Sequence, residues 1–184
     1  MRSRGKALNR WIKKEPPSLD DGAERRDFIA DAIAKYASPS ASVLEIGCNA
    51  GSNLLALKKR GFSRLAGVDV SLRALQSARH EFTQYHGDLR EMFDRLKADG
   101  PFDVVFSLAV LMHIHPDDDE IIRRIPELVG QYLITCEWEL LGNAYIVPRD
   151  YGQMFGDQLE QVHAETGFIV DKITGYHLRV FRRT

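Results

Sequence analysis

Short runs of apolar and β-branched residues alternate along the chain with longer segments whose apolar residues recur at helical spacing. The short runs predict strands and the longer segments predict helices, which is the alternation typical of a parallel sheet flanked by helices. The predicted strands are 42–47, 64–70, 83–87, 102–108 and 131–137. The predicted helices between them are 51–60, 72–81, 89–98 and 117–129.

The pattern changes after the fifth predicted strand. A loop over 138–152 leads to a predicted helix near 153–165, and 168–181 predicts two strands joined around Thr174 and Gly175. These two strands would complete a seven-stranded, mostly parallel sheet in an α/β fold. A C-terminal antiparallel hairpin would end this sheet.

Two helical segments precede the first predicted strand. Residues 4–14 are basic and place Leu8, Trp11 and Ile12 on one helical face, and a second helix is predicted over 22–37. The basic segment could be a lid over a substrate pocket, or a contact for RNA phosphates or a membrane surface. It could equally be a surface helix whose apolar stripe packs on the core.

Length and charge limit the function classes. The chain has 184 residues, which fits one domain, and we expect a core over 41–184 with 1–40 as a helical lid or cap. A net charge of −1 gives no overall field that would recruit nucleic acid or acidic membrane, so neither is expected as a partner. No apolar run could span a bilayer and no secretory signal is present, so we expect a cytoplasmic protein.

Two helix starts carry additional signals. Asp88 followed by Glu91 fits a capping box, in which each side chain accepts a hydrogen bond from the backbone of the other residue. Pro116 and the acids from Asp117 to Glu120 are favoured at a helix start by the fixed proline φ and the helix dipole. We therefore interpret this acidic run as a helix N-terminus rather than as a metal site.

The segment 43–53, VLEIGCNAGSN, joins a predicted strand to a predicted helix through a turn that contains glycines. Free backbone N–H groups and the positive helix end at such a turn can bind a ligand. A dinucleotide fingerprint would need further glycines at 49 and 52, and neither is present. The residues at alternate positions are instead Glu45, Gly47, Asn49 and Gly51.

This spacing resembles motif I of class I S-adenosylmethionine-dependent methyltransferases, usually E/D-x-G-x-G-x-G, with Asn49 at the middle glycine. Asn enters left-handed backbone conformations at low cost, so the turn can keep its path. Three later segments follow in the order of the family. They are 64–70, which ends near Asp69; 85–89, which resembles the end of the third strand; and 102–114, which resembles the fourth strand and the segment beneath the methyl donor.

The resemblance implies a Rossmann-like fold, S-adenosylmethionine as methyl donor and S-adenosylhomocysteine as product. It assigns Glu45 to the amino-acid part of the donor, Asp69 to the ribose hydroxyls and Asp88 to the adenine amino group. The donor-binding residues that it implies are Glu45, Gly47, Cys48, Asn49, Gly51, Asn53, Asp69, Val70, Asp88, Leu89 and Ser107.

Candidate catalytic residues follow the fourth and fifth predicted strands. Histidine is the usual general base near neutral pH, and His113 and His115 lie where the acceptor is expected to enter. In the family a histidine at the place of His113 sometimes only packs, so both roles stay open. Glu137 is a second candidate base or acceptor ligand. The His-x-His pair lacks a third ligand at suitable spacing, so no metal is expected.

Acceptor selectivity is expected from the loop 138–152, because open α/β sheets bind substrates at the loops beyond their strand ends. An arginine among aromatic residues suits a flat or anionic acceptor group, although these aromatics could instead pack the loop onto the sheet with Arg149 in solvent. The predicted acceptor-binding residues are His115, Tyr145, Arg149 and Tyr151.

Two segments refine the expected function. EIGCNAGSNL at 45–54 and VLMHIHPD at 110–117 also resemble methyltransferases associated with the biosynthesis of nonulosonic acids and other surface sugars. We therefore expect methylation of an oxygen or nitrogen of a small molecule, such as a sugar or a related metabolite. The alternatives are an RNA or protein methyltransferase that uses the basic N-terminal segment, and a non-catalytic protein that binds S-adenosylmethionine.

Overall fold

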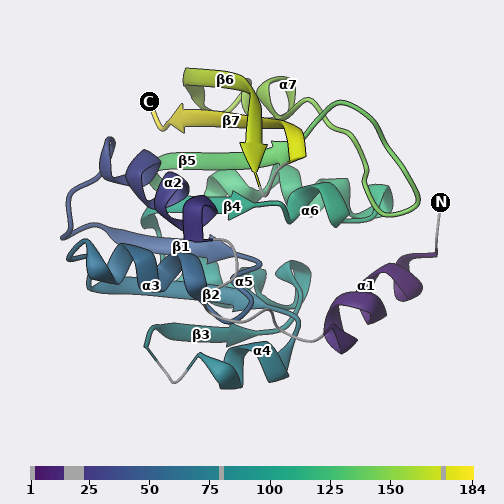
Figure 1. Ribbon diagram of the computed structural model, residues 1–184, viewed down its shortest axis with the longest axis horizontal. Helices are drawn as coiled ribbons and strands as arrows, with labels where there is room; N and C mark the ends of the chain where they lie inside the picture. Colours follow the sequence, from purple (N-terminus) through teal and green to yellow (C-terminus); the bar gives the residue numbers. More distant parts are fainter. Residues whose placement is uncertain (1–2, 15–22, 79–80, 171–172) are drawn as a thin grey trace.

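The computed structural model describes residues 3–14, 23–78, 81–170 and 173–184. Its centre is a seven-stranded sheet in the order β3-β2-β1-β4-β5-β7-β6 (Figure 1). The strands are β1 Ser42–Ile46, β2 Arg64–Asp69, β3 Thr83–His86, β4 Phe102–Leu108, β5 Val129–Trp138, β6 Glu160–Val170 and β7 Ile173–Arg182. The first five strands pair in parallel, and β7 is antiparallel to both β5 and β6. The predicted fold class is confirmed.

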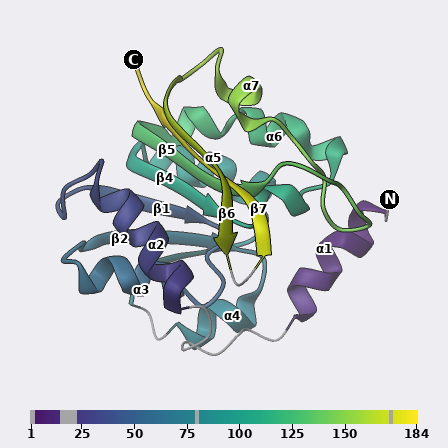
Figure 2. The same ribbon diagram turned by 45° about the horizontal axis from the view of Figure 1, so that its top comes forward.

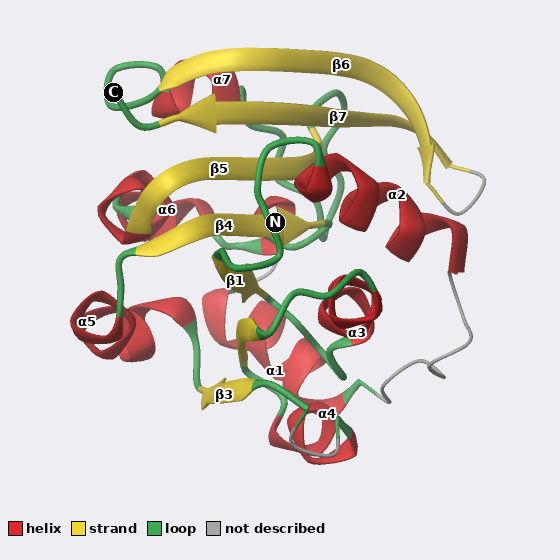
Figure 3. Ribbon diagram, turned by 90° about the vertical axis from the view of Figure 1, so that its left-hand side faces the viewer, coloured by secondary structure: helices red, strands yellow, loops and turns green. Residues whose placement is uncertain are grey.

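Helices cover both faces of the sheet. They are α1 Arg4–Lys13, α2 Ala23–Ala34, α3 Ser52–Lys59, α4 Leu72–Ser77, α5 Leu89–Asp99, α6 Asp119–Arg123 and α7 Tyr151–Phe155, with short 3-10 helices η1 Leu111–His113, η2 Pro116–Asp118 and η3 Ile125–Leu128. Figure 3 shows α2, α3 and α4 on one face and α5, α6 and α7 on the other. None of the described helices is both long and apolar enough to cross a membrane.

Successive residues of the central strands pack on opposite faces of the sheet. Val104 and Phe106 of β4 belong to the apolar cluster that includes Ile33 of α2, whereas Val105 belongs to the cluster that includes Phe93 of α5. All three strand residues are fully buried. A parallel sheet with helices on both faces buries both sets of side chains, which explains why this strand is a continuous apolar run in the sequence.

The carboxyl ends of the parallel strands lie along one edge of the sheet, and α1 lies beyond them (Figures 1 and 2). The predicted capping box at this edge is confirmed. The Asp88 carboxylate accepts a hydrogen bond from the Glu91 N–H at 3.1 Å, and the Glu91 carboxylate accepts one from the Asp88 N–H at 3.1 Å. This reciprocal pair fixes the start of α5 directly after β3.

The predicted helix near 153–165 is wrong beyond Phe155, where α7 ends, because β6 begins at Glu160. This strand is the edge of the sheet and pairs only with β7. Most of its described side chains between 161 and 166 are exposed, so this part of β6 lacks the run of buried apolar residues that marks the central strands in the sequence. Gly175 was expected at the turn but lies inside β7.

The predicted helix over 117–129 is divided into η2, α6 and η3. Pro126 lies at the start of η3, where it cannot donate the backbone hydrogen bond that a continuous α-helix requires. The other predicted strands and helices match to within a few residues at their ends. Three parts of the predicted arrangement lie outside the described residues: the junction of the two N-terminal helices, where the sequence has Pro16-Pro17, position 22 at the start of the second helix, and positions 79–80 of the helix predicted over 72–81.

Candidate active site

A cavity of about 410 Å³ lies at the carboxyl edge of the sheet, where β1, β2, β3 and β4 end. Its lining joins these strand ends to the segment 108–118 that follows β4 and to one face of α1. The lining contains most of the donor-binding residues expected from the sequence, namely Glu45, Gly47, Cys48, Asn49, Asn53, Asp69, Val70, Asp88 and Leu89. It also contains both candidate histidines, His113 and His115.

The turn between β1 and α3 uses three left-handed residues. The φ angles are +73° at Gly47, +51° at Asn49 and +75° at Gly51. A Cβ added at Gly47 would lie 2.4 Å from a methyl group of Val110, so the residue there must lack a side chain. Asn49 keeps the left-handed path as predicted, and its side-chain oxygen accepts a hydrogen bond from the Ala50 N–H at 2.7 Å.

Asp69 at the end of β2 links this turn to the start of α4. Its Oδ2 accepts a hydrogen bond from the Asn49 N–H at 2.8 Å, and its Oδ1 accepts one from the Ser71 N–H at 2.8 Å. Burial raises the pKa of Asp69, although the hydrogen bonds from Ser71 and Asn49 oppose this shift. Each carboxylate oxygen has a second lone pair, so the group can still accept from ligand hydroxyls.

Glu45 in the cavity wall is almost fully buried at 1% exposure. Its Oε1 accepts a hydrogen bond from Nδ2 of Asn53, in the first turn of α3, at 2.6 Å. The neighbouring Cys48 thiol is kept neutral, because burial raises its pKa, with further contributions from Glu45 and Asp69. The strand end and the helix start are therefore joined by a polar contact that also borders the cavity.

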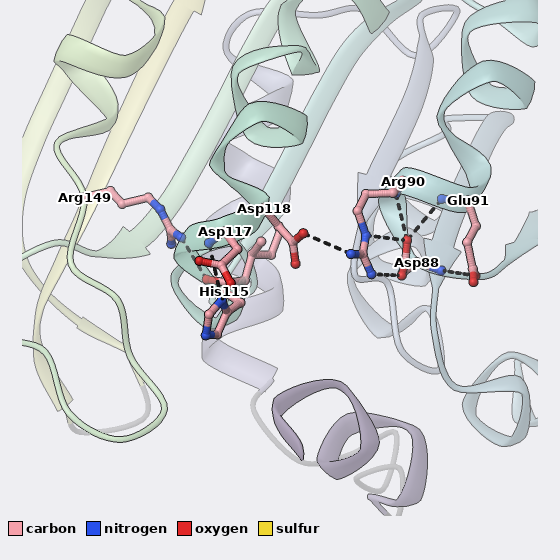
Figure 4. Close-up of polar contacts among 8 residues, drawn as sticks. Asp88, Arg90, Glu91, His115, Asp117, Asp118 and Arg149 are labelled. Atoms are coloured by element: carbon pink, nitrogen blue, oxygen red, sulfur yellow. Dashed lines mark hydrogen bonds and ion pairs between the residues drawn. The ribbon is translucent and has the colours of Figure 1, made fainter. Parts of the chain in front are cut away.

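Asp88 is bridged to the opposite wall of the cavity by Arg90, a residue that sequence reasoning missed. The Arg90 guanidinium forms an ion pair with the Asp88 carboxylate, and its Nη1 donates to Asp118 Oδ1 of η2 at 2.9 Å. Figure 4 shows the Arg90 side chain between these two carboxylates. All three residues line the cavity. Only the folded chain brings Asp118 near β3, so no local sequence signal identifies this bridge.

His113 lies at the end of η1 and is held from two sides. Its Nδ1 is 2.8 Å from the carbonyl oxygen of Tyr145, and its ring lies 4.6 Å from the Trp11 ring. A carbonyl can only accept, so Nδ1 carries the proton and Nε2 keeps its lone pair. Burial lowers the pKa of His113, and the charges of Arg10 and Lys14 lower it further. The imidazole is therefore neutral at neutral pH.

His115 also lines the cavity but is oriented differently. Its Nδ1 accepts a hydrogen bond from the Asp117 N–H at 3.3 Å and lies 3.3 Å from the Asp117 carboxylate (Figure 4). This contact caps η2, so the imidazole helps to start the short helix. The acids from Asp117 onward do begin a helical segment, as the sequence indicated.

The part of the chain that the structure describes holds no group of three or more His, Cys, Asp or Glu side chains placed for a metal ion.

Two expected site residues lie behind the cavity wall. Glu137 is fully buried and accepts hydrogen bonds from the N–H groups of Val110, at 3.0 Å, and Met112, at 3.3 Å. Burial raises the pKa of Glu137 to about 7, and these hydrogen bonds oppose the shift. Ser107 of β4 is also fully buried. Neither residue is part of the described cavity lining. Through its hydrogen bonds to Val110 and Met112, Glu137 instead supports the segment that carries His113.

The loop after β5 likewise supports this segment. The Arg149 guanidinium forms an ion pair with Asp119 at 2.6 Å and donates to the carbonyl oxygens of Leu111 and Ile114 at 2.9 and 2.8 Å. Its side chain is only 4% exposed. Tyr151 is fully buried against Phe155. The described lining includes neither residue, and the same holds for Tyr145 and Gly51.

Sequence reasoning missed several lining residues because they belong to elements distant along the chain. They are Leu8, Trp11 and Lys14 at α1, Arg90 of α5, Asp118 of η2 and Tyr176 of β7. The apolar stripe of α1 was visible in the sequence, and two of its members, Leu8 and Trp11, do face the cavity. The stripe could not show which surface it covers.

The family model described as a methyltransferase domain matches residues 22–172. The chain therefore belongs to this family of methyltransferases. The expectation of a methyltransferase with this fold is confirmed.

Known proteins show how far the similarity extends. The tRNA U34 carboxymethyltransferase of Psychromonas ingrahamii is 29% identical over 142 residues, which cover 71% of this chain and 43% of that protein. This chain thus spans less than half the length of that curated relative.

Two solved structures have a similar fold at low sequence identity. The PH0226 protein of Pyrococcus horikoshii OT3 has a TM-score of 0.71 at 16% identity, with 92% of this chain and 95% of that chain covered. A Burkholderia thailandensis 1,6-didemethyltoxoflavin-N1-methyltransferase, solved with its substrate and S-adenosylhomocysteine, has a TM-score of 0.70 at 17% identity, with 98% and 87% covered.

Proposed function

We propose that this protein binds S-adenosylmethionine in the cavity at the carboxyl edge of the sheet and methylates an oxygen or nitrogen of a small-molecule acceptor. The observation that carries this proposal is that Glu45, Asp69 and Asp88, from three neighbouring strand ends, line one cavity beside the glycine turn. In open α/β sheets this edge is where ligands bind.

The residues present fit this donor. Gly47 lines the cavity with its backbone alone, because a Cβ there would meet Val110. Asp69 would accept from the ribose hydroxyls, and Asp88 from the adenine amino group. Glu45 would lie toward the amino-acid moiety. When bound, S-adenosylmethionine supplies a methyl group whose bond to cationic sulfur breaks, with the electron pair leaving on sulfur.

The contribution of the protein is mainly positional. Holding two reactants at near-attack distance can lower the barrier by about 7–11 kcal/mol. His113 would accept the proton of a hydroxyl acceptor on Nε2, because Nδ1 is committed to the Tyr145 carbonyl. Glu137 and Arg149 would keep the 110–114 segment, and with it His113, in place.

A small acceptor is favoured by the position of α1. Leu8, Trp11 and Lys14 lie on the cavity opposite the strand ends, so an acceptor must fit beneath this helix. Within the segment 1–40, α1 would then act as the lid, whereas α2 packs on a face of the sheet. The resemblance to enzymes of surface-sugar biosynthesis makes sugars a natural part of any acceptor panel.

A second candidate is an RNA substrate. It is supported by the basic character of α1, which contains no acidic residue, and by the tRNA-modifying relative. Each phosphate contact makes binding weaker at higher salt, so RNA affinity that falls steeply with salt would favour this alternative.

Calorimetric titration with S-adenosylhomocysteine tests donor binding directly. We expect Asp69→Ala to weaken binding by about 1–3 kcal/mol, because charge-assisted hydrogen bonds to the ribose are lost. Unchanged affinity in a folded variant would contradict the ribose assignment. Tight binding without turnover on sugars, other metabolites and RNA would instead indicate a non-catalytic protein.

Turnover of an identified acceptor tests His113. The base must be neutral, and burial lowers its pKa below the ordinary 6.5. Turnover should therefore rise with pH through a value below 6.5 and level off by neutral pH. We expect His113→Gln to reduce turnover by about 10²-fold or more with S-adenosylhomocysteine affinity preserved. Normal turnover in this variant would show that the histidine only packs.

A further inference from the structure

We propose that the acceptor is an organic anion, an apolar molecule with a carboxylate or phosphate group, and that Arg10 and Lys14 at α1 hold this charge beside His113. The proposal rests on the function proposed above and adds the chemical class of the acceptor. Three observations carry it: the charges at α1, their aromatic supports and the apolar wall of the cavity.

Two positive charges at the end of α1, those of Arg10 and Lys14, lack a carboxylate partner in the described part of the chain. Neither side chain forms an ion pair with an acid there, and α1 itself has no acidic residue. Acids near this side of the cavity are engaged elsewhere, since Asp118 pairs with Arg90 and Asp119 pairs with Arg149. A bound anion would supply the missing counter-charge.

Both cations are held on aromatic rings next to His113. The Arg10 guanidinium lies 3.9 Å from the centre of the Tyr145 ring, and the Lys14 ammonium lies 4.8 Å from that of Trp11. The Trp11 ring in turn lies against His113, and the Tyr145 carbonyl binds His113 Nδ1. Lys14 lines the cavity, and Arg10 lies beside it, exposed and just outside the lining. Their field reaches the imidazole, because both lower the pKa of His113.

Apolar side chains complete the wall around this charge. The cavity lining includes Leu8 of α1, Met112 of η1, Ile114 directly after η1, and Ile121 of α6. Such a wall favours an apolar body, while Arg10 and Lys14 favour a negative group at one end. A hydroxyl elsewhere on the same molecule could then reach His113.

The helix also provides a control charge. Arg10 lies in the last turn of α1, and Lys14 is the extended residue that follows the helix. Lys13 is exposed as they are, but it does not line the cavity, and among the described residues it does not lie over an aromatic ring. Lys13→Gln therefore removes the same charge from the same helix without touching the proposed anion site.

The test uses the full chain saturated with S-adenosylhomocysteine, with benzoate as probe and benzamide as its neutral isostere. Dissociation constants are measured by ligand-observed NMR titration. We expect benzoate to bind at least roughly tenfold more tightly than benzamide. Arg10→Gln and Lys14→Gln should each weaken benzoate binding by roughly three- to tenfold, while Lys13→Gln leaves it unchanged. Unchanged S-adenosylhomocysteine affinity shows that each variant is folded.

Equal or absent binding of benzoate and benzamide would overturn the proposal, and so would an equal loss in Lys13→Gln, which would indicate bulk charge alone. Tight, salt-sensitive binding of a single-stranded RNA oligonucleotide that depends equally on all three cations would overturn it in favour of a nucleic-acid acceptor. Failure of the protein to bind S-adenosylhomocysteine contradicts the proposed donor instead, so the two failures are distinguishable.

Discussion

Asn49 shows how a single residue can replace a glycine in the turn between β1 and α3. Its φ of +51° is a left-handed conformation that costs most side chains about 1–2 kcal/mol. The side-chain Oδ1 of Asn49 offsets part of this cost by accepting a hydrogen bond from the Ala50 N–H, and the backbone N–H of Asn49 donates to Asp69. The turn therefore keeps its path without the middle glycine of the family motif.

This account predicts the order of two substitutions. Asn49→Ala should lower the free energy of unfolding by about 1–2 kcal/mol, because alanine lacks both conformational freedom and the side-chain acceptor. Asn49→Gly should cost less than about 1 kcal/mol, because glycine adopts this φ without strain. Urea unfolding of the three proteins measures both values, and an alanine variant as stable as the glycine variant would refute the explanation.

Two acids that end strands, Asp69 and Glu137, differ in where their carboxylates lie, because only Asp69 lines the cavity. The Asp69 carboxylate accepts hydrogen bonds from the N–H groups of Asn49 and Ser71, which hold it at the cavity. Glu137 also ends a strand, but its carboxylate accepts from the backbone of Val110 and Met112 behind the cavity. The sequence predicts where along a strand an acid lies. It does not predict which backbone N–H groups will donate to its buried carboxylate.

At the scale of elements, the cavity has two walls joined by one arginine. Arg90 in the first turn of α5 connects Asp88, beside β3, with Asp118 of η2. The two carboxylate side chains are only 11% and 9% exposed, so their contacts with the guanidinium are poorly screened by solvent. The bridge should therefore hold the part of the cavity between Asp88 and Asp118 at a fixed width.

Arg90→Met removes this bridge while keeping much of the side-chain bulk. We expect S-adenosylhomocysteine affinity to fall roughly five- to tenfold, because Asp88 and Asp118 lose a charge-assisted partner. Arg95→Met is the matched control, since Arg95 lies on the same helix and pairs with Asp99 at the surface. Calorimetry that finds the same affinity for both variants would exclude a role of the bridge in donor binding.

At the scale of the whole molecule, the buried Glu137 makes the stability of the fold depend on pH. Its pKa is raised from the ordinary 4.5 to about 7 by burial. The folded protein therefore holds this proton more tightly than the unfolded chain does. The resulting stabilisation is fully present below pH 4.5 and is lost as the pH rises through about 7.

The difference between wild type and Glu137→Gln isolates this effect. From pH 4.5 to 7 the free energy of unfolding of the wild type should fall relative to the variant, by at most about 3 kcal/mol. Denaturant unfolding at several pH values measures the difference. A constant difference across this window would show that Glu137 has the same pKa in the folded and unfolded protein.

The sequence by itself determined the parallel sheet, its flanking helices and the donor turn. These features depend on local signals: apolar runs, glycine and asparagine at left-handed positions, and the Asp88–Glu91 capping pair. The C-terminal hairpin was predicted, but the first part of its edge strand β6 was predicted as helix, because it is largely exposed and pairs only with β7.

Only the tertiary structure decided which face of α1 covers the cavity, that Arg90 bridges its walls, and that Glu137 and Arg149 support it from behind. Each of these contacts joins residues more than twenty positions apart. Their formation depends on how the packed layers bring distant segments together, and the local pattern does not encode that arrangement.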